Sequence, residues 1–215
     1  MKNYKFLTIL LAIGLVIVAY KWVACSTSQT ETAAGAVVEK STIDDIMTRS
    51  SVRAYSDKEV EPEKIDTLLR AAMAAPTARN LQPWRFVVIT DRALLDTISA
   101  NFGSMTMAKN ASLAIVTCGD LSAAMEGEGR DYWIQDVSAA TENLLLAAHA
   151  MGLGAVWCGI YPVSSRVTDF SALLSLPDNI IPMACVCIGY PAGESTPKDK
   201  WHPEYIRYNS WSDRK

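Results

Sequence analysis

Histidine is scarce in this chain of 215 residues, which contains only His149 and His202. His149 lies in an apolar helical segment, and neither histidine has a partner at a spacing typical of a catalytic triad or a metal site. The chain also lacks a phosphate-binding GxxxxGKS/T loop, a GxGxxG fingerprint after its first expected strand and a GxSxG nucleophile elbow. If the protein is an enzyme, we therefore expect a cofactor to carry the reaction.

Cysteine is sparse as well, with five residues and no CxxC pair. This spacing argues against a zinc site and against a redox dithiol. Cys118, Cys158, Cys185 and Cys187 each lie within an apolar run that is typical of a buried strand. We expect these four residues to serve as small core residues, with Cys185 and Cys187 facing the same side of a strand.

The chain has no excess of positive charge, because 20 lysines and arginines oppose 23 aspartates and glutamates, for a formal net charge of −3. This balance argues against a nucleic-acid partner. Half of the residues are hydrophobic, which is enough for one domain to bury a core without disulfides or a structural metal.

The first 25 residues differ in composition from the rest. Lys2 and Lys5 precede an uncharged apolar run at residues 6–20, which is typical of a secretory signal peptide. Cys25 resembles the lipid-accepting cysteine of bacterial lipoproteins, although Trp22 stands where that motif usually has leucine. An uncleaved membrane anchor is the alternative. These interpretations predict a protein that is exported to the bacterial cell envelope or tethered to its membrane.

Residues 26–40 are small and polar without sustained periodicity, which indicates a linker, so we place the folded domain at residues 41–215. The longest helical segment covers residues 134–151, and only Asp136 and Glu142 within it carry charge. Further helices are expected at residues 41–47, 62–75 and 94–100, and strands at residues 85–90, 112–118, 155–161 and 183–190. This succession predicts a layered α/β or α+β domain.

Three segments have residues suited to binding a cofactor. Residues 49–53 (RSSVR) place two guanidinium groups and two hydroxyls within five positions, and arginine forks suit phosphate oxygens. Residues 75–84 (APTARNLQPW) form a stiff loop with several hydrogen-bond donors. In residues 152–161, Gly159 would let a flat ring approach the backbone because it has no Cβ. A solvated charge at a helix end and an ordinary helix-to-strand turn are the structural alternatives for the first two.

Taken in this order, the three segments resemble the nitroreductase family of FMN-dependent oxidoreductases. The resemblance extends over residues 41–211, and its strongest parts are RSSVR, APTARNLQPW and DVSAATENLLLAAHAMGLGAVWCGIYP. The C-terminal sequence GYPAG…PKDKWHPEYIRYNSW is also similar to the end of that family. The resemblance implies an α+β fold, with a nitroreductase-like central sheet flanked by helices. It also implies an intertwined homodimer with two FMN molecules at the subunit interface.

The resemblance further implies which residues hold FMN. Residues that would bind its phosphate and ribityl chain are Arg49, Ser51 and Arg53, with Ser50 nearby. A basic residue near the C-terminus usually completes the phosphate site, and here the candidates are Lys200 and Lys198, ahead of Arg207.

Two other sets of residues would meet the flavin ring. Those that would reach it from the partner subunit are Pro76, Thr77 and Asn80. Those that would pass beside it, with a backbone N–H directed toward its N5 atom, are Trp157, Cys158 and Gly159.

The implied function is electron transfer from NAD(P)H through FMN to an electron-poor small molecule, such as a nitroaromatic or a quinone. No side chain is expected to act as a catalytic acid, and no metal is expected. One alternative is a flavin enzyme with another acceptor, such as a reductive dehalogenase. The other is a non-catalytic, membrane-tethered protein that binds flavin or serves as a scaffold.

Overall fold

The structure, a computed structural model, describes residues 41–211. The expected signal or anchor segment at residues 1–25 and the expected linker at residues 26–40 lie outside the described residues, as do residues 212–215. Within residues 41–211, no helix is both long enough and apolar enough to span a membrane.

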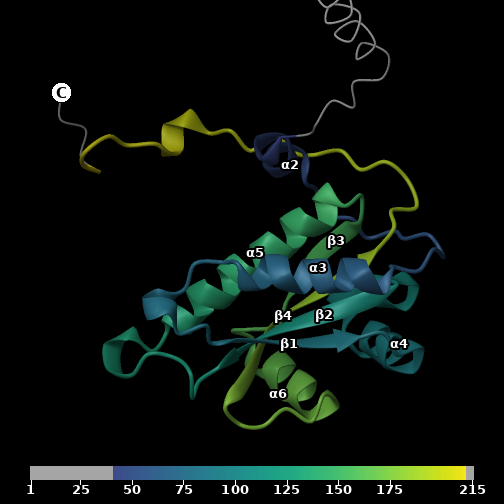
Figure 1. The fold of residues 1–215 in the computed structure, drawn as a ribbon, viewed down its shortest axis with the longest axis horizontal. Helices are drawn as coiled ribbons and strands as arrows, with labels where there is room; N and C mark the ends of the chain where they lie inside the picture. The colour runs from purple at the N-terminus through teal and green to yellow at the C-terminus, as the bar shows by residue number, and fades with distance from the viewer. Residues whose placement is uncertain (1–40, 212–215) are drawn as a thin grey trace, which may run out of the picture. The chain divides into compact units, whose positions relative to one another are not determined.

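A four-stranded sheet forms the centre of the folded domain (Figure 1), with strand order β1-β2-β4-β3. All three neighbouring pairs are antiparallel. The strands are β1 (Trp84–Ile89), β2 (Leu113–Asp120), β3 (Gly154–Gly159) and β4 (Ile180–Gly189). In this order β1 and β3 form the two opposite edges of the sheet.

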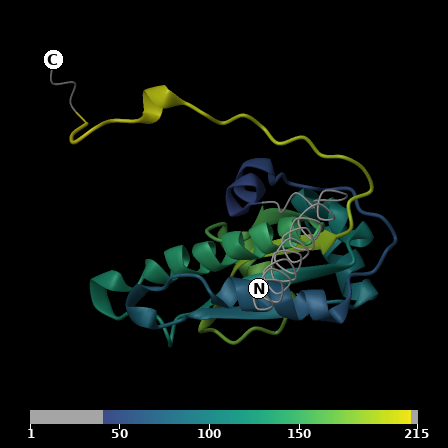
Figure 2. The same ribbon diagram turned by 45° about the horizontal axis from the view of Figure 1, so that its top comes forward.

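Helices cover both faces of the sheet (Figures 1 and 2). One face carries α3 (Pro62–Met73) and α5 (Tyr132–Ala150). The other face carries α4 (Arg92–Asn101), the 3-10 segment η3 (Gly103–Asn110) and α6 (Ser164–Leu173). The architecture is therefore α+β, as predicted.

The central strand β2 contributes to two separate cores. Leu113 and Ile115 pack with α3 and α5, whereas Ala114 and Val116 pack with α4 and α6. Successive strand residues point to opposite faces, so a strand covered on both sides is apolar throughout. The four cysteines of the domain are buried and unpaired, and Cys185 and Cys187 share one face, as predicted.

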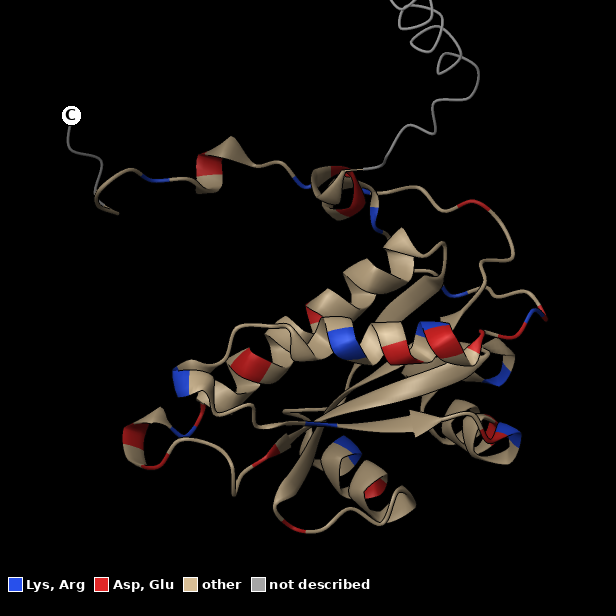
Figure 3. Cartoon of the chain, viewed as in Figure 1, with Lys and Arg blue, Asp and Glu red and all other residues tan. Residues whose placement is uncertain are grey.

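Charged side chains are almost absent from the sheet (Figure 3). The four strands contain only Arg85 and Asp120, and these two residues form an ion pair with 2.6 Å between Nη2 and Oδ2. Asp120 also accepts hydrogen bonds from Ser122 and Asn179. This ion pair joins the start of β1 to the end of β2.

Two segments at the ends of the domain expose apolar side chains. In α2 (Thr42–Thr48), Ile43 and Met47 are 66% and 70% exposed. After β4, Pro191 and Ala192 still pair with Tyr55 and Ala54, and the rest of residues 191–211 extends beyond the sheet in both views (Figures 1 and 2). We call residues 191–211 the C-terminal arm. Its aromatic residues are between 70% and 84% exposed: Trp201, Tyr205, Tyr208 and Trp211.

Candidate functional site

Residues 49–53 lie along the edge strand β3. Ser51 forms a parallel bridge with Ala155, and the backbone N–H of Val52 donates to the carbonyl of Ala155 at 3.0 Å. This approach depends on Gly154, because a Cβ there would lie 2.6 Å from Cγ1 of Val52. The structure thus brings the first and third predicted segments side by side.

The two arginines of residues 49–53 have different surroundings. The Nε atom of Arg49 lies 3.3 Å from Oε1 of Glu142 on α5, and 18% of the Arg49 side chain is exposed. Arg53 is exposed, and its Nη1 donates to the carbonyl of Ser51 at 3.5 Å. Most of the five donors of the Arg53 guanidinium group therefore remain available to an anion.

Open space lies beside Gly159 at the end of β3. A Cβ on Gly159 would meet no atom within 4 Å, in contrast to one on Gly154. The guanidinium group of Arg166 on α6 donates to the carbonyl of Gly159 at 2.8 Å. The backbone of Gly159 is thus held by Arg166 through its carbonyl, and it remains accessible to a ligand where a Cβ would stand.

The side chains before Gly159 point into the two cores. Trp157 packs partly buried on the α3 and α5 side, and Cys158 is 6% exposed on the α4 and α6 side. A hydrogen bond with Cys187 and burial raise the pKa of Cys158, while the charges of Arg53 and Arg166 act in the opposite direction. The Cys158 thiol is therefore protonated at neutral pH.

The C-terminal arm passes next to residues 49–53. The hydroxyl oxygens of Ser50 and Ser195 lie 2.6 Å apart. Lys198 and Lys200 follow a few residues later and are exposed. Their assignment to the phosphate site, like that of Arg207, stays a prediction.

Residues 76–82 form a loop between α3 and β1 that has an unusual backbone. Arg79, Asn80 and Gln82 have φ angles of 51°, 58° and 51°, in the left-handed region that costs a non-glycine residue about 1–2 kcal/mol. We call residues 76–82 the strained loop. Such conformations persist only where the surroundings hold them, and they occur often at binding sites.

Asp136 of α5 holds the strained loop. Its Oδ1 accepts from the backbone N–H of Ala78 at 2.9 Å, and its Oδ2 accepts from the hydroxyl of Thr77 at 3.1 Å. The Thr77 oxygen in turn accepts from the backbone N–H of Gln82 at 3.1 Å. The amide group of Gln82 donates to Oδ1 of Asn80 at 3.0 Å.

Asp136 and Glu142 were not among the predicted site residues. They are the two acidic residues of an otherwise apolar helix, and each contacts one predicted binding segment, Glu142 through Arg49 and Asp136 through Thr77 and Ala78. An isolated carboxylate in an apolar helix is a sequence signal that would have indicated such contacts, because buried charge needs partners.

The strained loop and residues 157–159 lie at opposite edges of the sheet. The loop leads into β1, and β2 and β4 separate β1 from β3, with a spacing of about 4.8 Å between neighbouring strands. Within one chain, the structure therefore does not bring Pro76, Thr77 and Asn80 together with Trp157, Cys158 and Gly159.

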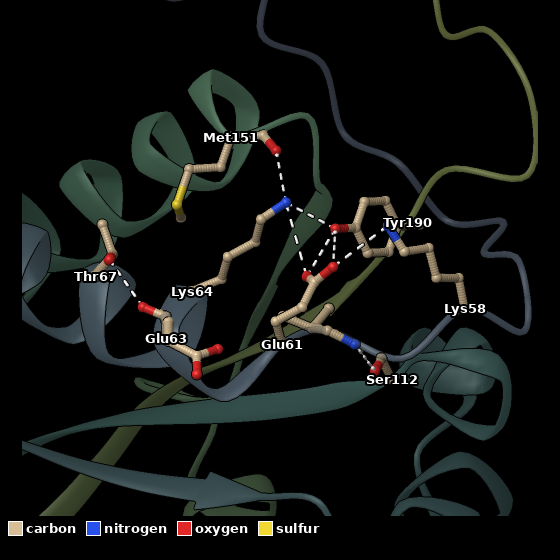
Figure 4. A network of polar contacts seen from close by, with 9 residues as sticks. Lys58, Glu61, Glu63, Lys64, Thr67, Ser112, Met151 and Tyr190 are labelled. Atoms are coloured by element: carbon tan, nitrogen blue, oxygen red, sulfur yellow. Dashed lines mark hydrogen bonds and ion pairs between the residues drawn. The ribbon is translucent and has the colours of Figure 1, made fainter.

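A second polar network lies at the base of the C-terminal arm (Figure 4). The hydroxyl of Tyr190 lies 2.7 Å from Oε2 of Glu61 and 2.7 Å from Nζ of Lys64, and Lys64 also donates to the carbonyl of Met151 at 3.2 Å. The Tyr190 hydroxyl, together with Lys58, lowers the pKa of Glu61 to about 2. This network connects the residue before the arm to the start of α3 and the end of α5.

Among residues 41–211, no group of three or more His, Cys, Asp or Glu side chains is arranged so that it could hold a metal ion. His149 lies 2.9 Å from the hydroxyl of Thr48, and His202 lies 2.8 Å from Glu204. The two histidines thus have local polar partners.

The fold and the placement of residues 49–53 against the edge strand define a nitroreductase-like α+β domain. The Nitroreductase family model matches residues 46–121 and 99–190, and the chain belongs to that family. It is 43% identical over 169 residues to a protein of Archaeoglobus fulgidus, a match that covers 77% of this chain and 96% of that one.

Solved structures agree with this membership. A crystal structure from Parabacteroides distasonis is 45% identical, has a TM-score of 0.75, and the match covers 79% of this chain and 98% of that one. It and the Archaeoglobus protein share the name "putative NADH dehydrogenase/NAD(P)H nitroreductase". An FMN-dependent nitroreductase from Clostridium difficile R20291 is 30% identical, with a TM-score of 0.72 and coverage of 79% and 99%.

Proposed function

We propose that this protein is an FMN-dependent oxidoreductase that passes electrons from NAD(P)H to an electron-poor small molecule, such as a nitroaromatic or a quinone. The observation that carries this proposal is the position of residues 49–53 along β3, the strand that ends at Gly159 with open space beside it. Family membership supports it, as do the names of relatives that describe NAD(P)H nitroreductases and an FMN-dependent nitroreductase.

The residues along β3 fit FMN in their chemistry. Arg49 and Arg53 offer guanidinium groups for a phosphate, and Ser50 and Ser51 offer hydroxyls for phosphate or ribityl oxygens. A flat ring can approach the backbone at Gly159, where a Cβ would meet nothing. When bound, FMN supplies the transfer of hydride and electrons between donor and acceptor.

Each binding segment has a distinct task in this proposal. Arg53 binds the phosphate with its exposed fork, and Arg49 does so from a position oriented by Glu142. The strained loop, with Pro76, Thr77 and Asn80, meets the flavin of a second copy, because it lies at the opposite edge of the sheet from β3. Lys200 completes the phosphate site from the C-terminal arm.

The proposal includes a homodimer with two flavins at the interface. Exposed apolar residues in α2 and four exposed aromatic residues in the C-terminal arm support it, because a protein seldom leaves apolar surface of this extent uncovered. A second copy that receives the arm would bury both.

We also propose that residues 1–25 export the protein or tether it to the membrane of the cell envelope. The apolar run between Lys5 and Lys21 and the position of Cys25 support this proposal. Mass spectrometry of the mature N-terminus distinguishes a lipidated Cys25, an unmodified cleaved end and an uncleaved chain that begins at Met1.

The test of the proposed function is anaerobic stopped-flow mixing of the FMN-loaded full chain with NADH or NADPH. We expect the flavin absorbance to bleach and to return when a nitroaromatic or a quinone is added. A flavin that stays oxidised with both nucleotides would contradict the proposed donor and would favour a non-catalytic flavin-binding protein.

Two variants test whether residues 49–53 bind the phosphate of FMN. Arg53→Ala should raise the dissociation constant of FMN about 10- to 100-fold, as expected for the loss of charge-assisted hydrogen bonds. Arg70→Ala, which removes the same charge from the exposed surface of α3, is the matched control and should leave FMN binding unchanged. Equal affinities of the two variants would exclude residues 49–53 as the phosphate site.

A further inference from the structure

Asp136 is a buried carboxylate with an uncommon set of partners. It is 6% exposed, and among residues 41–211 it forms no ion pair. Its two hydrogen-bond partners are donors in the strained loop: the backbone N–H of Ala78 and the hydroxyl of Thr77. Burying a carboxylate is unfavourable unless hydrogen bonds compensate for its lost hydration, and the two donors of the strained loop supply such hydrogen bonds.

The chemistry of the two donors explains why a carboxylate stands at this position. A backbone N–H can only donate, and an ionised carboxylate can only accept, so the Thr77 hydroxyl donates its proton to Asp136 while its oxygen accepts from Gln82. Asp136 must therefore accept twice, with one oxygen for each donor. An ionised carboxylate does so, whereas an amide group offers one accepting and one donating end.

The influence of Asp136 extends along the loop. Through Thr77 it fixes the backbone of Gln82, and the Gln82 amide donates to the side chain of Asn80. Arg79, Asn80 and Gln82 are the three residues of the strained loop with left-handed backbone conformations. The hydrogen bonds of one buried carboxylate thus lead to Thr77 and Asn80, two of the three loop residues that we propose to meet the flavin.

We propose that Asp136 is a positioning residue, which holds Thr77 and Asn80 in the conformation that receives FMN. It does not touch the cofactor and acts through the loop. This inference rests on the proposed function, because it assigns the loop to the flavin.

The first experiment requires no FMN. Arg79 is exposed in the strained loop, so trypsin can cleave after it when the loop opens. We expect Asp136→Ala to accelerate cleavage between Arg79 and Asn80 at least tenfold in the full chain, and Asp136→Asn to accelerate it less, since one acceptor remains.

The matched control is Thr141→Val. Thr141 lies on the same helix and is fully buried, and its hydroxyl lies 2.7 Å from the carbonyl of Val137 and 3.0 Å from the hydroxyl of Thr117, away from the loop. It should lower the free energy of unfolding without changing cleavage at Arg79. If Asp136→Ala is cleaved there no faster than Thr141→Val, Asp136 does not hold the loop and the inference is wrong.

The second experiment measures the dissociation constant of FMN by quenching of flavin fluorescence. We expect a rise of at least tenfold for Asp136→Ala, a smaller rise for Asp136→Asn and none for Thr141→Val. In a double-mutant cycle, Thr77→Val should add little to Asp136→Ala, because both changes break the same link. Full additivity would contradict an action through Thr77.

The outcomes separate this inference from the proposed function. If the wild-type chain binds FMN and Asp136→Ala binds it equally well despite a loosened loop, the positioning role is wrong and the proposed function stands. If the wild-type chain binds no FMN, the proposed function and the positioning role both fail. If Asp136→Ala does not fold, Asp136→Asn decides the question by the same two measurements.

Discussion

Two glycines of β3 should respond in opposite ways to the same substitution. In Gly154→Ala the new Cβ lies 2.6 Å from Cγ1 and 2.7 Å from Cβ of Val52, so the chain must shift. Overpacking of this kind costs about 1–3 kcal/mol of the free energy of unfolding. In Gly159→Ala the new Cβ meets no atom within 4 Å. Since alanine is favoured over glycine inside a strand by roughly 0.5–1 kcal/mol, Gly159→Ala should fold at least as stably as the wild type.

The binding of FMN should change most in Gly159→Ala, the variant whose fold is intact. If the flavin ring lies against the backbone at Gly159, the added methyl group occupies its place, and a cost of about 1–3 kcal/mol corresponds to a 5- to 150-fold higher dissociation constant. Urea denaturation without FMN measures the first quantity, and quenching of flavin fluorescence measures the second. A Gly159→Ala variant that is stable and binds FMN with wild-type affinity would refute the placement of the ring beside Gly159.

Two further predictions concern assembly and pH. A chain that ends at Ala192 lacks most of the C-terminal arm, with Trp201, Tyr205, Tyr208 and Trp211. We expect light scattering to show a monomer for this variant and the proposed dimer for the full chain; a truncated chain that still forms a dimer would contradict the role of the arm. A hydrogen bond from Ser122, with smaller contributions from Asn179 and Arg85, lowers the pKa of Asp120 to about 2. Because this folded pKa lies below the unfolded value, Asp120 stabilises the fold above about pH 4 and loses this effect as the pH falls toward 2. Asp120→Asn should therefore be less stable than the wild type by roughly 2 kcal/mol at pH 7, and urea denaturation should show the difference vanish near pH 2; a difference independent of pH would contradict the assignment.

The sequence predicted the elements with strong periodicity. The helix expected at residues 134–151 is α5 (Tyr132–Ala150), and its many apolar residues reflect burial between α3 and the sheet. The strands were predictable because helices cover both faces of the sheet, so that their sequences are continuously apolar. In contrast, α6 (Ser164–Leu173) was not predicted: it buries only Phe170, so its sequence carries little helical pattern.

The site was partly predictable for a related reason. Residues 49–53 and Gly159 are local patterns with evident chemistry, and the structure brings their segments together along β3. The contacts of Asp136 with Thr77 and of Glu142 with Arg49 join residues 59 and 93 positions apart, and no local pattern specifies which distant partner a carboxylate meets. Likewise, position 154 requires glycine because Val52 packs against it, and this contact exists only in the folded chain.

The central claim is that residues 49–53 and β3 hold FMN, and its most direct test is the amount of FMN retained after gel filtration. The full chain is incubated with FMN, separated from free flavin and compared with a variant that carries both Arg49→Ala and Arg53→Ala. We predict that the wild-type protein elutes with close to one FMN per chain, while the double variant elutes without flavin and with an unchanged circular dichroism spectrum. Wild-type protein that elutes colourless, or a double variant that retains as much FMN as the wild type, would contradict the account.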